Sequence, residues 1–213
     1  MKFAHWGVFT LAAMAAAGLL FGGVAQADEH QGDPFPLKNC PVMDSGLDSM
    51  GGPVKLVHEG REIRFCCQGC IGRFEDNAEA FLEEVDAAIV DSQLAVYPME
   101  NCIVADRPLG DSPVNVVVNN RLFRTCCAGC AAGIQDDAEG YFEKLDAAVK
   151  EAQADSYALE TCPVSGQELG SMGDPVELVI ANRLVKLCCA GCEAGVEENP
   201  ADIIEQVDES RQG

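Results

Sequence analysis

The feature that most constrains this chain of 213 residues is a pattern of twelve cysteines that occurs in three copies. Each copy has a lone cysteine, a gap of roughly two dozen residues, and then the sequence Cys-Cys-x-Gly-Cys. The members are Cys40, Cys66, Cys67 and Cys70, then Cys102, Cys126, Cys127 and Cys130, and finally Cys162, Cys188, Cys189 and Cys192. Sulfur placed so regularly is there to form bonds, either to a soft metal ion or to other sulfur atoms.

The spacing of the copies indicates three tandem modules rather than one domain. The lone cysteines recur with a period of about 60 residues, and Arg61, Arg121 and Arg183 repeat in register with them. The expected boundaries are 37–92 for module 1, 96–153 for module 2 and 156–210 for module 3. A module of this size has too little apolar core to be stable alone, so a covalent or metal cross-link is expected in each.

Each module has the pattern of a β-hairpin followed by a helix, so the predicted fold class is α+β, with small zinc-finger-like modules. Two short runs flank a two-residue turn in each copy, which is typical of a hairpin. These runs are 54–57 and 61–65, 114–118 and 121–125, and 176–180 and 183–187. Beyond each last cysteine, apolar residues recur at three- and four-residue steps, as in a helix. Pro200 predicts that the helix restarts there, and Asn77 and Asp137 predict the same break in the other copies.

The segment from Met1 to Ala27 has the pattern of a signal peptide. Trp6 to Leu20 is an apolar run, and Ala25-Gln26-Ala27 is a small-x-small cleavage site. Cleavage after Ala27 predicts a periplasmic or secreted protein, whereas an uncleaved membrane anchor is the alternative. We expect residues 28–36 to be a loose leader before module 1.

The charge balance limits the classes of partner. The chain has 35 acidic and 14 basic residues, for a net charge of −21. Nucleic acids and anionic membrane surfaces would repel such a chain, so neither is expected as a partner after signal cleavage. We also find no Ser/His/Asp arrangement, phosphate-binding loop or paired-carboxylate cleft, and the sequence therefore predicts a protein that is not an enzyme.

The predicted elements bring the cysteines of a module together. The lone cysteine precedes the hairpin, the Cys-Cys pair closes the second strand, and the last cysteine opens the helix. A glycine before the last cysteine would allow a tight turn, and the helix N-terminus would lower the pKa of that cysteine. Three thiolates suit Cu(I) and four suit Zn(II), so about one copper or zinc ion is expected per module. All twelve cysteines are candidate ligands.

With the Cys-Pro-Val sequence at Cys40 and Cys162, the hairpin and the Cys-Cys-x-Gly-Cys end, the chain resembles the TRASH/YHS group of treble-clef-related heavy-metal domains. The resemblance covers three tandem copies and implies copper or zinc sequestration, trafficking or sensing, with a metal transporter or sensor protein as partner. Many relatives carry a further cysteine at the positions of Met43, Ala105 and Ser165. The second cysteine of each pair could replace that ligand or could lie outside the site.

Three other interpretations of the sequence remain open. An exported chain with an even number of cysteines is often a disulfide-stapled scaffold that binds other proteins. Cys67-Gln68-Gly69-Cys70 also has the spacing of a thiol-disulfide oxidoreductase, although it follows a hairpin rather than a βαβ unit. Finally, cleavage after Ala27 would place His30 third in the mature chain, where it could complete a speculative square-planar Cu(II) site with the terminal amine.

Overall fold

The computed structural model describes residues 32–136 and 138–211, and it contains three hairpin-plus-helix units. The first unit comprises the 3-10 helix η1 (Leu47–Met50), β1 (Val54–His58), β2 (Arg61–Phe65), α1 (Gly69–Glu75) and α2 (Ala78–Leu94). The second comprises β3 (Val114–Val118), β4 (Arg121–Thr125), α3 (Ala128–Asp136) and α4 (Glu139–Gln153). The third comprises β5 (Val176–Ile180), β6 (Arg183–Leu187), the 3-10 helix η2 (Ala190–Cys192), α5 (Glu193–Glu198) and α6 (Pro200–Ser210). The predicted α+β class is confirmed.

The hairpins have the predicted strands and turns. Each sheet is one antiparallel pair, with Val54 opposite Phe65, Val114 opposite Thr125 and Val176 opposite Leu187. Both residues of each turn have positive φ, which gives the backbone twist that two-residue hairpins favour. The turn residues are Glu59 and Gly60, Asn119 and Asn120, and Ala181 and Asn182.

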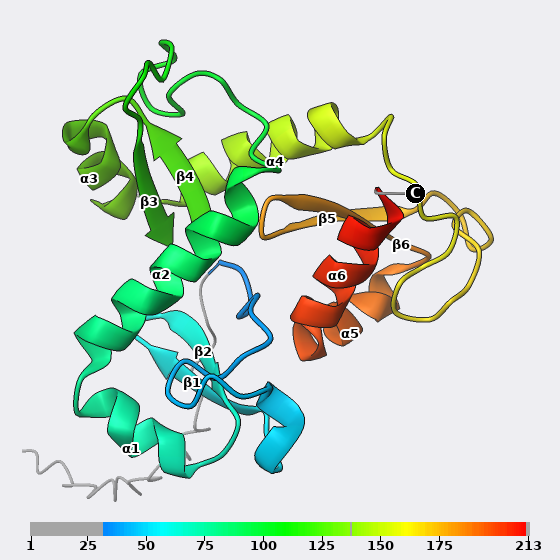
Figure 1. Ribbon diagram of the computed structural model, residues 1–213. Coiled ribbons are helices and arrows are strands. Elements are labelled where there is room, and N and C mark those ends of the chain that lie inside the picture. Colours follow the sequence, from blue (N-terminus) through cyan, green and yellow to red (C-terminus); the bar gives the residue numbers. More distant parts are fainter. Residues whose placement is uncertain (1–31, 137, 212–213) are drawn as a thin grey trace, which may run out of the picture.

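The helical part of each unit is broken in two, as the sequence predicts. In module 1, α2 begins after Asn77, and in module 3, α6 begins at Pro200, which tolerates the first helical position because it needs no backbone N–H there. Residue 137, the predicted break in module 2, lies outside the described residues, and α4 begins at Glu139. Apolar residues of the long second helix share a core with the hairpin of the same module, and in modules 1 and 2 this helix also contacts the next hairpin (Figure 1).

An ion pair ties each hairpin to the long helix of its own module. Its arginine is the first residue of the second strand, and its aspartate lies within the long helix. The pairs are Arg61 with Asp86 at 2.7 Å, Arg121 with Asp146 at 2.6 Å and Arg183 with Asp208 at 2.7 Å. The in-register arginines of the sequence therefore have one repeated structural role.

Glutamines at the ends of α2 and α4 join consecutive modules. Gln93 donates its amide to the carbonyl oxygen of Asn120 at 2.9 Å and accepts the N–H of Leu122 at 2.8 Å. Gln153 makes the same two bonds to Asn182 and Leu184, both at 2.9 Å. Each glutamine thus satisfies buried backbone groups of the following hairpin, which would be costly to leave unpaired.

The asparagines of the turns form further hydrogen bonds between consecutive modules. Asn120 donates its side-chain amide to the carbonyl of Glu62 in β2, and Asn182 donates to the carbonyl of Leu122 in β4. Both asparagine residues are fully buried. We call the buried polar groups around the turns, Asp33, Gln93, Asn120, Arg121, Gln153 and Asn182, the central hub.

Module 3 also contacts module 1. Arg64 donates to the backbone oxygens of Glu198 at 2.7 Å and of Glu197 at 2.5 Å, where α5 ends. A guanidinium group is well placed there because the last carbonyls of a helix lack internal partners. The three modules therefore form a closed arrangement in which each contacts the other two.

The loose leader expected at residues 28–36 is wrong for residues 33–36, which are buried. Asp33 forms two bonds to Arg121 at 2.6 and 2.5 Å and accepts the N–H of Ala181 at 2.6 Å. Phe35 is fully buried in the core of module 1. Asp33 contacts modules 2 and 3 at once, an interaction that composition and periodicity cannot reveal.

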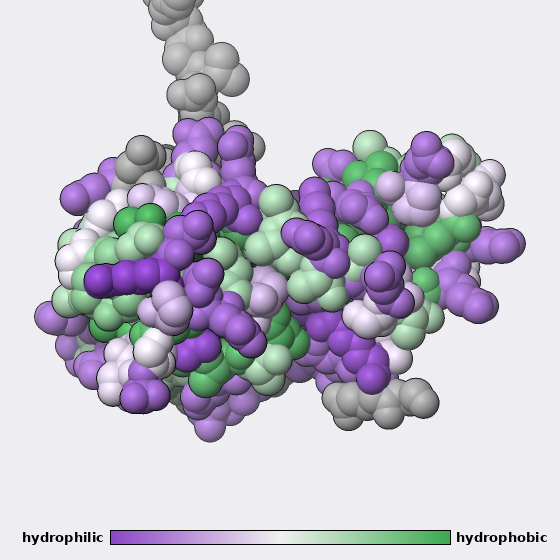
Figure 2. All heavy atoms as spheres, turned by 90° about the horizontal axis from the view of Figure 1, so that it is seen from above, coloured by the Kyte–Doolittle hydropathy of each residue, from purple (hydrophilic) through white to green (hydrophobic). Residues whose placement is uncertain are grey.

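The exposed surface agrees with the acid-rich composition. Figure 2 shows a face on which hydrophilic residues are interspersed with smaller hydrophobic patches. Among residues 32–136 and 138–211, none of the helices combines the length and the apolar character needed to cross a membrane. The predicted signal peptide at residues 1–27 lies outside this part of the chain.

The hub yields a stability prediction. Asp33→Ala should lower the free energy of unfolding by about 3 kcal/mol, because it leaves the buried Arg121 without its most buried partner. Lys38→Ala, which breaks an exposed pair with Glu205, should cost less than about 1 kcal/mol. Urea unfolding followed by circular dichroism measures both. Equal effects of the two variants would contradict a structural role for the leader.

Candidate metal centres

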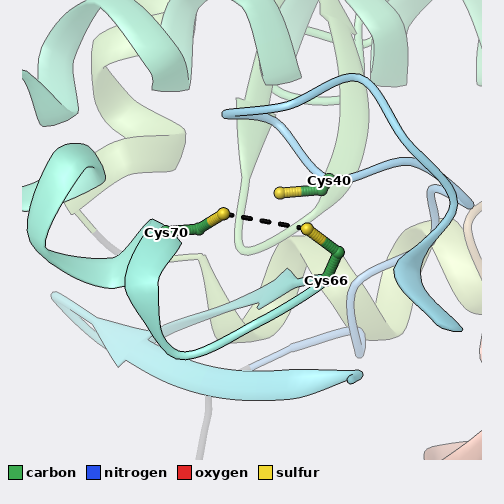
Figure 3. Close-up of side chains that lie close together, drawn as sticks. All are labelled: Cys40, Cys66 and Cys70. Atoms are coloured by element: carbon green, nitrogen blue, oxygen red, sulfur yellow. Dashed lines mark hydrogen bonds between the residues drawn. The ribbon is translucent and has the colours of Figure 1, made fainter. Parts of the chain in front are cut away.

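Three cysteines of module 1 meet at one point, although they come from three different elements. Cys40 lies in the loop before η1, Cys66 follows the last residue of β2, and Cys70 lies in the first turn of α1. Their side chains point toward one another in Figure 3. All three Sγ atoms lie within 4.8 Å of one another, and the sulfurs of Cys66 and Cys70 are 3.7 Å apart.

The same cluster occurs in the other two modules. Cys102, Cys126 and Cys130 form one, and Cys162, Cys188 and Cys192 form the other. The sulfur of the strand-end cysteine lies 3.8 Å and 3.7 Å from that of the helix cysteine in these two modules. Sulfurs bound about 2.3 Å from one ion at tetrahedral angles would be about 3.8 Å apart, so each cluster has the spacing of a metal centre.

The lone cysteine is held by a short hydrogen-bonded loop. The N–H of Cys40 donates to the oxygen of Ser45 at 2.8 Å, and the N–H of Asp44 donates back to the oxygen of Cys40 at 2.9 Å. Asp44, Asp106 and Gly166 stand four residues after the lone cysteines, and all have positive φ. Asp and Gly tolerate this conformation well. Their repeat at that position is a signal in the sequence from which this loop could have been predicted.

The second cysteine of each pair lies outside the cluster of three. The sulfurs of Cys67 and Cys127 are each 3.6 Å from the last cysteine of their module, and both side chains are half-buried. Cys189 is half-buried as well. Both residues of the pair follow the strand, and only the first of them enters the cluster. The geometry therefore provides three sulfurs in each centre and a fourth beside it in modules 1 and 2.

The glycine before the last cysteine does not serve the tight turn that we expected. Gly69, Gly129 and Gly191 are absent from the described residues that have positive φ, so the helix starts without special backbone geometry. A Cβ atom at Gly69 would instead lie 3.9 Å from the sulfur of Cys67, and one at Gly191 would lie 3.7 Å from that of Cys189. In those two modules the glycine leaves space beside the thiol of the second cysteine of the pair. A larger side chain in place of the glycine could cover that thiol.

The lone cysteine ionises most easily in modules 2 and 3. Burial opposes ionisation of Cys162, but hydrogen bonds from the Ser165 hydroxyl and from the backbone of Cys188 outweigh it and lower its pKa to about 6. Burial likewise opposes ionisation of Cys102, whereas hydrogen bonds from the backbone of Ala105 and other residues lower its pKa to about 7. At neutral pH the Cys162 thiol is therefore largely thiolate, the metal-binding form, and the Cys102 thiol is about half ionised.

The last cysteine behaves in the opposite way, and the expectation that the helix N-terminus would lower its pKa is wrong. Burial, followed by hydrogen bonding with Cys188, raises the pKa of Cys192 to about 12. Burial and Cys67 raise that of Cys70 to about 12, and hydrogen bonding with Cys127 is the largest cause of the same rise at Cys130. Each of these thiols forms a hydrogen bond with a neighbouring sulfur, so a metal ion would have to displace the proton of that bond.

Histidine contributes no ligand to these clusters. His30, the speculative Cu(II) ligand, lies outside the described residues. The ring of His58 packs edge-on against Phe74, with 5.3 Å between ring centroids. His58 is not part of any of the three cysteine clusters found among the described residues.

Cysteine substitutions should separate the cluster from the fourth sulfur. Cys70→Ser should reduce the metal bound by the reduced protein from about three equivalents to about two, because two sulfurs cannot replace a three-sulfur centre. The matched variant Cys67→Ser should retain about three. Metal analysis after anaerobic loading with Cu(I), the ion that suits three thiolates, measures both. Loss of one equivalent in Cys67→Ser would instead indicate a four-sulfur site.

Metal affinity should also depend on pH in a definite direction. In a chain with Cys70→Ser and Cys130→Ser, which keeps only the third cluster, affinity should rise with pH because Cys192 must lose its proton well below its pKa of about 12. Below about pH 6 the thiolate of Cys162 is also protonated, so affinity should fall by about one further power of ten per pH unit. Competition with a chelator of known proton affinity, from pH 5 to 9, measures the metal affinity at each pH. A dependence of affinity on pH whose slope does not change near pH 6 would contradict the prediction.

Comparison with known proteins gives no further guide to these centres. No family model, curated protein or solved structure matched the chain.

Proposed function

We propose that this is an exported protein that captures soft metal ions, copper as Cu(I) or zinc, through cysteine thiolates. The observation that carries the proposal is the gathering of three sulfurs within 4.8 Å in every module. All twelve cysteines are free of disulfide bonds, so each can supply a thiolate, the form that binds metal. Three such clusters in one chain favour a binding role over catalysis.

The number of sulfurs favours copper. Cu(I) is stable with three thiolates, whereas a closed Zn(II) site has four ligands. Each cluster has three sulfurs, and the fourth stands beside the cluster, 3.6 Å from its last cysteine in modules 1 and 2. We therefore propose Cu(I) as the preferred ion, with Zn(II) bound where the fourth sulfur joins the centre.

The role that fits an exported metal-binding chain is sequestration, trafficking or sensing. The predicted signal peptide and the resemblance to TRASH/YHS domains both support metal handling outside the cytoplasm. A metal transporter or a sensor protein is the partner that such a role requires. Binding of nucleic acid is not proposed, because the net charge of −21 opposes it.

The proposal is tested by measuring metal and thiols in the same sample. Protein isolated from copper- and zinc-replete cells without exposure to oxygen should contain about three metal equivalents. Its thiols should resist alkylation until a chelator is added, and the denatured, metal-free chain should then show all twelve. A protein without metal and without titratable thiols would contradict the proposal and support a disulfide-stapled scaffold.

A further inference from the structure

The three cysteine clusters differ in how far solvent can reach them. In module 1 the exposed fractions of Cys40, Cys66 and Cys70 are 1%, 0% and 3%. The cluster of module 3 is buried as well. In module 2, Cys102 is buried, but Cys126 and Cys130 are only half-buried. The second cluster is therefore the one that an incoming ligand can reach.

The loop after the lone cysteine explains part of this difference. Three residues after that cysteine, module 3 has Ser165, whose hydroxyl lies 3.3 Å from the sulfur of Cys188. Module 2 has the exposed Ala105 at this position, whose methyl group cannot make such a contact. Module 2 is also two residues shorter between the lone cysteine and the pair. Less of the chain is thus available to cover its cluster.

An arginine stands at the open edge of this cluster. Arg107 is exposed, and it donates from Nε to the sulfur of Cys126 at 3.0 Å and from a terminal nitrogen toward the sulfur of Cys127 at 4.0 Å. The equivalent residues, five after the lone cysteine, are the uncharged Ser45 and Gln167. Of these three positions, only that of module 2 brings a positive charge to the sulfurs.

The location of this charge indicates what it attracts. The chain has a net charge of −21, so its surface repels anions in general. A guanidinium group beside partly exposed sulfurs creates a local region where an anionic ligand can approach. Small ligands that carry soft metal ions through thiolates or carboxylates have this charge.

We propose, on the basis of the proposed metal binding, that the cluster of Cys102, Cys126 and Cys130 is the exchange site of the protein. There Arg107 attracts a small anionic thiol that delivers or removes the metal ion, while the buried clusters of modules 1 and 3 retain theirs. In removal, the incoming thiolate forms one metal–sulfur bond and the bond to Cys126 breaks. The electron pair stays on the Cys126 sulfur, which faces the guanidinium group, and the metal keeps its oxidation state.

A pair of alkylating reagents tests the role of Arg107 without any metal. Iodoacetate is anionic and iodoacetamide is neutral, and in both reactions a thiolate displaces iodide. The ratio of their rates at one cysteine cancels the fraction of thiolate, so it reports the local charge alone. With the reduced, metal-free protein, Arg107→Gln should lower the iodoacetate-to-iodoacetamide ratio at Cys126 and Cys127 about fivefold, as expected for one exposed charge about 4 Å away.

Two matched variants control this measurement. Arg107→Lys keeps the charge and should keep most of the ratio. Arg73→Gln removes an exposed arginine that contacts Met43 rather than a cysteine, and should leave the ratio unchanged in all modules. Peptide mass spectrometry gives the rate at each site. An unchanged ratio in Arg107→Gln, or equal reactivity of the three modules, would overturn the proposal.

Metal transfer tests the exchange itself. The protein is loaded with Cu(I) without oxygen and mixed with bathocuproine disulfonate, an anionic chelator whose copper complex absorbs visible light. About one third of the copper should transfer in a fast phase, which Cys130→Ser should abolish and Cys70→Ser should retain. A single phase for all three ions would overturn the exchange site but leave the proposed function intact. A protein that takes up neither Cu(I) nor Zn(II) would overturn both.

Discussion

The structure depends on a sharp change of direction between the end of a strand and the start of a helix. In module 1 this change brings Cys66 and Cys70, four residues apart, to a sulfur separation of 3.7 Å. The lone Cys40 reaches the same point from a separate loop, which the bond between its N–H and the oxygen of Ser45 closes. Val42 and Leu47 of this loop also pack against the core of the module, and a metal ion bound by the three sulfurs would add a direct link between the loop, the strand end and the helix.

The hairpin separates this cluster from the contacts that hold the modules together. The cluster lies at the open end of the hairpin, beside Phe65, and the turn lies at the other end. A five-residue strand is about 17 Å long, so the clusters lie on the periphery while the turns meet at the central hub (Figure 1). The hub consists of buried hydrogen-bonded groups such as the side chain of Asn120 and the amide nitrogen of Asn182, whose bonds need one defined arrangement of the modules. It can therefore fix the modules without involving their sulfurs.

Local patterns predicted the hairpins, the helix breaks and the meeting of the cysteines, because each depends on residues close in sequence or repeated with the cysteine period. The hub could not be predicted in this way. Gln93 resembles any polar residue at the end of a helix, and its partner Asn120 resembles any turn asparagine. Only the three-dimensional arrangement shows that one satisfies the backbone of the other. The expected lowering of the pKa of Cys70 is wrong for a similar reason, since burial and the neighbouring sulfur of Cys67 outweigh the helix N-terminus.

The repeats differ mainly at one end of each module. The arginine–aspartate pairs recur in all three modules, and the glutamine contacts occur at both junctions between consecutive modules. The loop beside the cluster changes instead, with Arg107 in module 2 at the position of Gln167 in module 3. A side chain there faces sulfur and solvent rather than the hub, so it can change without disturbing the packing between modules. Three copies of one module can thus provide cysteine clusters that differ in their exposure to solvent within a single folded unit.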